Sequence, residues 1–160
     1  MKRFLGIILT ICMLSGCLFM FTSCKKEQAA TGRMTVDINP SVEFMFDKDN
    51  KVISATALND DGEVILYGEA FVGKTAEEAA QMVVKIATET GYLVKGEVTA
   101  TSDEINISIS SDTAQIEDLY KKVENKVNDY VEKNGLSAQL KKGEAIALEE
   151  LRKYVVNNTE

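Results

Sequence analysis

The fold is decided by one alternating stretch, residues 34–46, Met-Thr-Val-Asp-Ile-Asn-Pro-Ser-Val-Glu-Phe-Met-Phe. Apolar and polar residues alternate on both sides of Pro40, and a period of two is that of a half-buried β-strand. Pro40 is the only proline in the chain, and it cannot donate the N–H that a sheet ladder requires. We therefore expect strands at 34–39 and 41–46, with an edge, a bulge or a bend between them.

The residues after this stretch predict a hairpin. Asp47-Lys48-Asp49-Asn50 has the composition of a turn, and the alternating residues 51–58 return as a third strand. Asn59-Asp60-Asp61-Gly62 predicts a further turn, and residues 63–73 show no clear period. The cluster at 47–50 is also a candidate calcium site. It lacks the glycine and the distal glutamate of an EF-hand loop, which favours the turn.

Helical periodicity follows in the second half of the chain. Thr75 and Glu78 have the spacing of a capping box, which predicts a helix that ends near Gly91. We expect three further elements: a strand at 105–110, a helix opened by Asp112 and Gln115 that ends near Gly135, and a shorter helix at about 144–156. The pattern indicates an α+β fold, a small antiparallel sheet with two main helices on one face and a short C-terminal helix.

The N-terminus has the organisation of an export signal. Lys2 and Arg3 precede an apolar run at 4–23, which is long enough to span a bilayer if it is not removed. The next residues are small and polar, without apolar periodicity. We therefore divide the chain into a signal or anchor segment (1–24), a polar tether (25–33) and an α+β domain (34–156).

Two cysteines in this region resemble the lipidation site of bacterial lipoproteins. Cys17 matches the motif better by residue type, but cleavage before it would leave an apolar mature end, so we favour Cys24. An uncleaved transmembrane anchor is the third alternative. Each alternative places residues 25–160 outside the cytoplasm, because Lys2 and Arg3 stay inside. The expected location is the bacterial cell envelope, on a lipid or an apolar anchor.

The side-chain inventory excludes several function classes. Twenty-five acidic and 18 basic residues give a net charge of −7, so no basic surface for nucleic acid is expected. The chain has no histidine, which excludes Ser-His and Cys-His nucleophile pairs and His-ligated metals. All three cysteines lie at or before Cys24. We expect no metal and no cofactor, and acidic pairs such as Asp60-Asp61 are typical of solvated turns and helix faces.

Asn39-Pro40 is the one place where the residues suggest chemistry. The plain interpretation is a strand bend with Asn39 as the turn residue. In the alternative, the side-chain amide nitrogen of Asn39 attacks the carbonyl carbon of the same residue, closes a five-membered succinimide and expels the nitrogen of Pro40. This step needs orientation and strain rather than histidine, because a fold can hold the nucleophile against the carbonyl. Residue chemistry alone leaves both interpretations open.

These segments together resemble the extracytoplasmic domain of the anti-sigma-I factors, the RsgI-like regulators of alternative sigma factors. The resemblance covers most of residues 34–150 and rests on these runs: Val36-Asp37-Ile38-Asn39-Pro40-Ser41-Val42-Glu43, Val52-Ile53, Ala57-Leu58-Asn59-Asp60-Asp61-Gly62, Gly73-Lys74-Thr75 and Gly91-Tyr92-Leu93. It implies a SEA-like or ferredoxin-like domain that cleaves itself between Asn39 and Pro40, the pieces staying associated until a protease pathway acts. Asp37 and Ser41, in the same motif, are candidates for orienting the reacting groups.

One departure from the family pattern limits what the resemblance implies. Full-length members carry a cytoplasmic sigma-binding domain before a transmembrane helix, whereas only three residues precede the apolar run here, so we expect no sigma-factor binding of that kind. The first hypothesis is a membrane-anchored envelope module, in sensing or signalling, that cleaves itself once and stays together as two pieces. The alternative is an uncleaved lipoprotein module that binds a protein or envelope ligand. Neither is an enzyme acting on external substrates.

Overall fold

The computed structural model describes residues 29–99, 103–111 and 116–143. Its elements in chain order are β1 (Gly32–Asp37), β2 (Ser41–Phe46), β3 (Val52–Ala57), α2 (Asp60–Leu66), α3 (Ala76–Glu89), β4 (Asp103–Ser111), α4 (Ile116–Asn134) and β5 (Ala138–Lys142). The expected α+β fold is confirmed. The first strand begins at Gly32, within the segment expected to be a tether, because Gly32 already pairs with Phe46 and Ser111.

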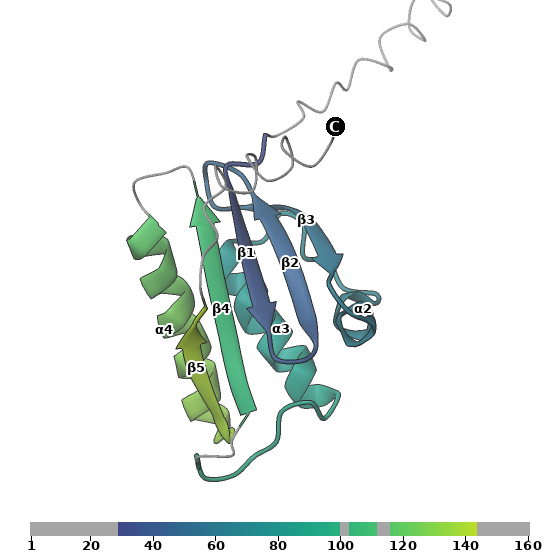
Figure 1. The fold of residues 1–160 in the computed structure, drawn as a ribbon, viewed down its shortest axis with the longest axis vertical. Coiled ribbons are helices and arrows are strands. Elements are labelled where there is room, and N and C mark those ends of the chain that lie inside the picture. The colour runs from purple at the N-terminus through teal and green to yellow at the C-terminus, as the bar shows by residue number, and fades with distance from the viewer. Residues whose placement is uncertain (1–28, 100–102, 112–115, 144–160) are drawn as a thin grey trace, which may run out of the picture.

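The five strands form one sheet in the order β3-β2-β1-β4-β5 (Figure 1). Strands β1 to β4 pair antiparallel, as expected. Strand β5 was not expected, and it lies parallel to β4, so the sheet is mixed. Its five residues are too few to show a clear period of two, and only Ala138 is buried. The strand that begins the domain, β1, therefore lies in the middle of the sheet with a neighbour on each side.

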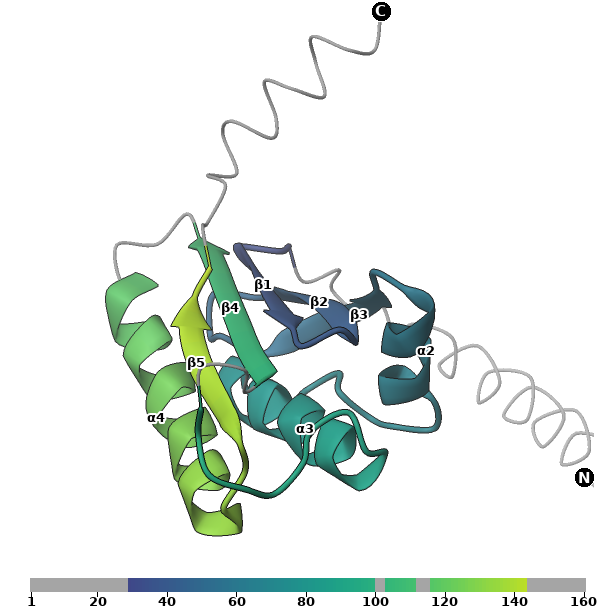
Figure 2. The same ribbon diagram turned by 60° about the horizontal axis from the view of Figure 1, so that its bottom comes forward.

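Helices α3 and α4 pack side by side on one face of this sheet (Figure 2). The inward positions of β2 are those that the alternation predicts, namely Val42, Phe44 and Phe46, and all three are buried. The centre of β1 contributes Met34 and Val36, which are fully buried between sheet and helices. Each such side chain stabilises the fold by about 1.5–3 kcal/mol. The other face of β1 and β2 carries polar side chains, including the ion pair between Arg33 and Glu43.

The helix ends follow the sequence signals. At the start of α3 the capping box is formed, because Glu78 N–H donates to the Thr75 hydroxyl and Thr75 N–H donates to the Glu78 carboxylate. Gly91 and Gly135 follow α3 and α4 with φ of 86° and 60°. Left-handed residues of this kind commonly end helices, and glycine adopts the conformation without a steric penalty.

Residues 59–66 differ from the sequence-based expectation of a turn followed by a segment without period. Residues 60–66 form α2, a helix of seven residues that lies beside the edge strand β3. The N-cap is Asn59, whose side chain accepts from Gly62 N–H. Asparagine at the N-cap and acidic residues in the first turn are both favourable at a helix start. The same residue types are favourable in turns, which is why the sequence pattern predicted a turn here instead of a helix.

Several expectations concern residues outside those described. They are the lipidation candidates Cys17 and Cys24, the opening of the second long helix at Asp112 and Gln115, and the C-terminal helix at 144–156. Within the described part of the chain, no helix is both long and apolar enough to cross a membrane.

Candidate functional site

The Asn39-Pro40 pair lies at the tip of the hairpin between β1 and β2. Asp37 and Ser41 are the last paired residues of the two strands, and Ile38 N–H donates to the Pro40 carbonyl at 2.8 Å, which closes the turn. Asn39 has a φ of 56°, a left-handed conformation that is uncommon for residues other than glycine. The Asn39 side chain is exposed, while Pro40 is buried. The expected bend is thus a tight turn whose strained residue is Asn39.

Asp37 stabilises this turn from within. Its carboxylate Oδ1 accepts a hydrogen bond from the main-chain N–H of Asn39 at 3.2 Å. Such local bonds between an Asp side chain and a main-chain N–H two residues later are typical of turns. Ser41 takes part through its main chain, because its carbonyl accepts from Leu58 N–H at 2.9 Å. The structure therefore brings all four predicted site residues, Asp37, Asn39, Pro40 and Ser41, into one turn.

A residue that the sequence analysis did not single out completes the site. Asn59 Oδ1 accepts from Ser41 N–H at 3.0 Å and from Gly62 N–H at 2.8 Å, and Asn59 Nδ2 donates to Asn39 Oδ1 at 3.2 Å. These three hydrogen bonds, which we call the Asn59 clamp, join the turn to the start of α2 across 20 residues of sequence. Its sequence signal is the Asn-Asp-Asp-Gly run, which has the composition of an N-cap and an acidic first turn.

The clamp fixes the orientation of both side-chain amides. Main-chain N–H groups can only donate, so the Asn59 atom that faces Ser41 and Gly62 must be its oxygen. The Asn59 NH₂ group then faces Asn39, and the Asn39 atom that accepts from it must be Oδ1. Asn39 Nδ2, the nucleophile of a succinimide-forming reaction, is consequently the atom that the clamp leaves unbound.

Helix α2 is itself held close to the turn. A Cβ atom at Gly62 would overlap the main-chain carbonyl oxygen of Ser41, so only glycine permits this approach. In the first turn of α2, Asp61 Oδ1 accepts a hydrogen bond from the Tyr92 hydroxyl at 2.6 Å. That hydrogen bond, with smaller contributions from burial and from the negative charge of Asp61, raises the pKa of Tyr92 above its ordinary value of 10.0. The clamp is thus connected to the end of α3.

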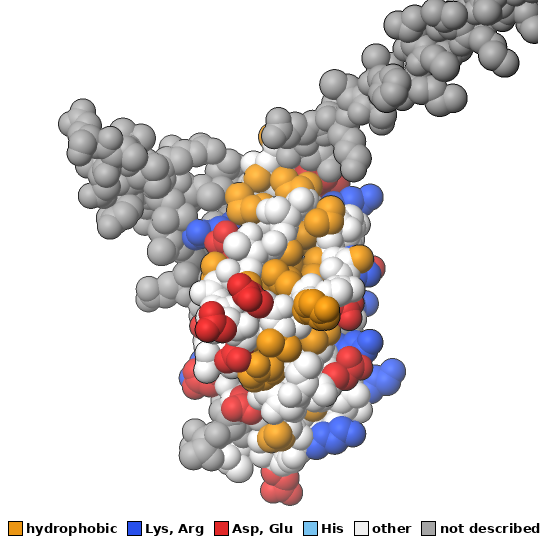
Figure 3. All heavy atoms as spheres, turned by 90° about the vertical axis from the view of Figure 1, so that its right-hand side faces the viewer, with side chains coloured by type: hydrophobic (Ala, Val, Ile, Leu, Met, Phe, Trp, Pro, Cys, Tyr) orange, Lys and Arg blue, Asp and Glu red, His pale blue; other side chains and the backbone are white. Residues whose placement is uncertain are grey.

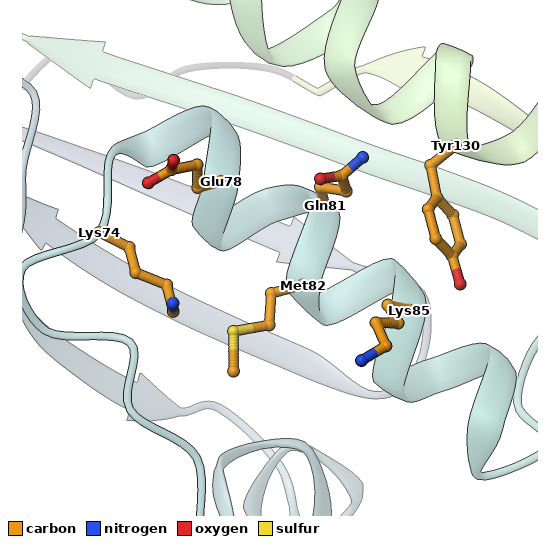
Figure 4. A pocket seen from close by; sticks show the side chains of 6 residues that line it. All are labelled: Lys74, Glu78, Gln81, Met82, Lys85 and Tyr130. Atoms are coloured by element: carbon orange, nitrogen blue, oxygen red, sulfur yellow. The ribbon is translucent and has the colours of Figure 1, made fainter.

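An open groove lies on the helical side of the molecule (Figure 4). Its volume is about 410 Å³, and it follows α3 toward Tyr130 of α4. The lining side chains are Lys74, Glu78, Gln81, Met82, Lys85 and Tyr130, of mixed charge. None of them belongs to the turn or to the clamp, so the groove is a surface separate from the Asn39 site.

The side of the molecule on which α2 lies carries exposed apolar residues among acidic ones (Figure 3). Leu58, Val64, Tyr67 and Val72 are between 47% and 88% exposed. Across the described ranges, no group of three or more Asp, Glu, Cys or His side chains could hold a metal ion. At the candidate calcium cluster, Asp47 Oδ1 accepts from the N–H groups of Asp49 and Lys51, bonds that are typical of aspartate in a turn.

Comparison with known proteins gives a match over residues 31–158, to the family described as the anti-sigma factor RsgI-like central domain. The anti-sigma-I factor RsgI of Bacillus subtilis strain 168 is 31% identical over 117 residues, which are 72% of this chain and 29% of that protein. The anti-sigma-I factor RsgI of Bacillus anthracis is 34% identical over 87 residues, 54% of this chain and 19% of that protein.

A third relative is the anti-sigma-I factor RsgI6 of Acetivibrio thermocellus, 40% identical over 58 residues, which are 36% of this chain and 8% of that protein. The chain spans less than a third of the length of these three relatives. The family match includes every strand and helix described above. The chain therefore belongs to the anti-sigma factor RsgI-like central domain family.

Proposed function

We propose that this domain is an extracytoplasmic signalling module that cuts its own chain once, between Asn39 and Pro40, and stays together as two pieces. The observation that carries the proposal is the left-handed Asn39, whose Oδ1 is held in the Asn59 clamp while its Nδ2 takes no part in the clamp. The relatives are named anti-sigma-I factors, which supports a role in signalling. The cut is a single turnover on the chain itself, so the module is not an enzyme in the usual sense.

The proposed chemistry uses only Asn39 and Pro40. Asn39 Nδ2 forms a bond to the carbonyl carbon of the same residue, and the bond from that carbon to the Pro40 nitrogen breaks. One proton moves from Nδ2 to the Pro40 nitrogen, which leaves as a secondary amine, so the step consumes no water. Because the nucleophile and the carbonyl belong to one residue, the reaction is intramolecular. The fold has only to hold the side chain of Asn39 in the orientation that reacts. Water then hydrolyses the exposed succinimide.

Strand β1 explains how the pieces would remain associated. After the cut, β1 belongs to the N-terminal piece, but it still pairs with β2 on one side and β4 on the other. Met34 and Val36 remain in the core, and withdrawing them would expose their apolar surface to water at a cost of about 1.5–3 kcal/mol each. We therefore expect the two pieces to remain bound to each other after the cut.

The proposed location is the bacterial cell envelope. The basic and apolar N-terminus supports an export signal, with lipidation at Cys24, or alternatively at Cys17, or an uncleaved anchor. The membrane would then be the partner of the N-terminal piece. Release of β1 would free residues 40–160 from that anchor and convert a change in the envelope into a signal.

The test is the covalent state of the 39–40 bond. The full chain with a C-terminal tag is expressed in bacteria, extracted under denaturing conditions, and analysed by gel and intact mass. We expect a tagged fragment that begins at Pro40, and only the uncut chain for Asn39→Gly. Glycine keeps the left-handed turn without strain but removes the nucleophile, so it is a closer control than Asn39→Ala.

An uncut wild-type chain would contradict the proposal and leave the alternative function, a module that binds a protein or envelope ligand without cleavage. The observation that favours this second candidate is the groove between Lys74 and Tyr130, which is concave and lies away from the turn. In that case Lys85→Glu, in the groove, is the variant that tests ligand binding.

A further inference from the structure

We propose that Asn59 is the positioning residue for cleavage at Asn39, an inference that rests on the self-cleavage proposed above. No other described side chain donates a hydrogen bond to the Asn39 side chain. Asn59 itself cannot rotate freely, because its Oδ1 is held by two main-chain N–H groups, those of Ser41 and Gly62. The direction of its NH₂ group is therefore built into the backbone around it.

Orientation is the first effect of this contact. A side-chain amide has two ends of similar size, and only the nitrogen end can form the succinimide. Donation from Asn59 Nδ2 selects the rotamer of Asn39 in which the oxygen faces α2 and the nitrogen faces away from it. Without that donor, water would satisfy either end of the exposed Asn39 side chain equally well. Productive and unproductive orientations would then compete.

Charge is the second effect. An amide nitrogen becomes a nucleophile when it loses a proton, and the negative charge that develops in this step resides mainly on the amide oxygen. The Asn59 N–H group points at that oxygen, Asn39 Oδ1, at 3.2 Å. A donor placed where charge develops stabilises the reacting state more than the resting state. The same hydrogen bond thus orients the nucleophile and makes its nitrogen easier to deprotonate.

Two substitutions separate this role from the structural role of Asn59 as an N-cap. Asn59→Asp keeps the oxygen that accepts from Ser41 and Gly62, and aspartate is an equally good N-cap, but its carboxylate has no proton to donate. Asn59→Ser keeps an N-cap of similar strength and is too short to span the distance to Asn39. Thr75→Ala is the matched control, because it weakens the N-cap of α3 at a distance from the turn.

The experiment follows cleavage of the full chain after cell-free synthesis, with time points on a denaturing gel and thermal melts of the same proteins. Near neutral pH we expect the wild type and Thr75→Ala to cleave at similar rates. Asn59→Asp and Asn59→Ser should cleave about tenfold to a hundredfold more slowly, while their melting temperatures stay close to that of the wild type.

The pH profile is the decisive measurement. In the Asn59→Asp variant the new carboxyl group regains a donor when it is protonated. Its cleavage rate should therefore approach that of the wild type as pH falls through the carboxyl pKa, and the rate of Asn59→Ser should not. Cleavage of Asn59→Asp at the wild-type rate at every pH would overturn the role of Asn59. The role of Asn59 would also be overturned if Asn59→Asp cleaved slowly, had a lower melting temperature, and did not recover its cleavage rate at acid pH. An uncut wild type would instead remove the self-cleavage on which the inference rests.

Discussion

The two turns at either end of β2 each contain one left-handed asparagine, in different surroundings. One contains Asn39 with φ of 56°, the other Asn50 with φ of 57°. In each turn an aspartate accepts from a main-chain N–H two residues later, Asp37 in the first and Asp47 in the second. A left-handed asparagine beside an aspartate that accepts from the main chain thus occurs in both turns, so this combination does not by itself distinguish the Asn39 site.

The difference lies in what holds the asparagine side chain. The Asn39 side chain accepts a hydrogen bond from Asn59, a residue of another segment, and Asn39 is followed by Pro40. At the second turn the long-range bonds come from the main chain, since the Asn50 carbonyl accepts from Ala76 N–H. Asp47 is 3% exposed and also accepts from Lys51 N–H. The second turn is thus held by main-chain bonds and a buried aspartate, whereas in the first the side chain of Asn39, the proposed nucleophile, is oriented by a residue of another segment.

The largest effect is expected from exchanging each asparagine for glycine. Asn39→Gly should abolish cleavage, because it removes the nucleophile, while Asn50→Gly should leave cleavage complete. Both variants should unfold within about 1 kcal/mol of the wild type, since glycine accepts a left-handed φ. Denaturing gels measure cleavage and urea titrations measure stability. Loss of cleavage in Asn50→Gly would mean that the turns are not independent.

The next effect comes from pushing α2 away from the first turn. In Gly62→Ala the new methyl group overlaps the Ser41 carbonyl oxygen, and main-chain atoms cannot move aside cheaply. We expect a loss of about 1–3 kcal/mol in the free energy of unfolding and slower cleavage. Gly96→Ala is the control, because its Cβ comes no closer than 3.4 Å to the Ser137 Cβ atom. Unchanged cleavage in Gly62→Ala would separate α2 from the site.

The second turn should respond in stability alone. Asp47→Ala leaves the N–H groups of Asp49 and Lys51 without their acceptor, and unsatisfied groups of this kind cost about 1–3 kcal/mol. Asp47→Asn keeps an acceptor oxygen and should cost less. Urea unfolding gives the order of the two variants, and the gel assay should show normal cleavage in both. Slower cleavage in either would contradict the assignment of this turn to stability.

The smallest effect concerns Tyr92, which follows α3 and whose hydroxyl donates to Asp61 of α2. A raised pKa means that the folded protein favours the neutral hydroxyl. Its contribution to stability is therefore complete below the ordinary pKa of 10.0 and is lost as pH rises through the higher value of the folded state. Tyr92→Phe should lack this part of the alkaline loss of stability. Urea midpoints that stay parallel for the two proteins, from neutral pH to above the ordinary tyrosine pKa, would contradict it.

The sequence predicted the hairpin well because alternation is a local property. Val42, Phe44 and Phe46 alternate with outward residues, and nothing later in the chain changes that period. The capping box at Thr75 and Glu78 was equally local, and the structure confirms both of its bonds. Signals that depend on neighbours in the sequence alone were sufficient for these elements.

The site was predicted only in part because the contact that Asn59 makes with Asn39 is not local. The motif itself pointed to Asp37, Asn39, Pro40 and Ser41, and the structure places them in one turn. Asn59 lies 20 residues later, in a run whose composition suits a turn as well as a helix start. Strand β5 was missed for the same reason, because its pairing with β4 depends on the chain's return after α4. Contacts between segments that are distant in the sequence leave no periodic pattern of apolar residues from which they could be predicted.

The position of β1 has a mechanical consequence. Gly32, where β1 begins, pairs with Ser111, and Lys142, where β5 ends, pairs with Ile107 of the same strand β4. The chain thus enters β1 and leaves β5 toward the same end of the sheet (Figure 1). Tension that draws these two points apart acts on one end of the hydrogen-bond ladders that join β1 to β4 and β4 to β5. The residue pairs of these ladders would therefore break one after another. Sliding β1 lengthwise would instead strain all six of its pairs with β2 together. We therefore expect the sheet to open at a lower force when these two points are drawn apart than when β1 is pulled along its own axis.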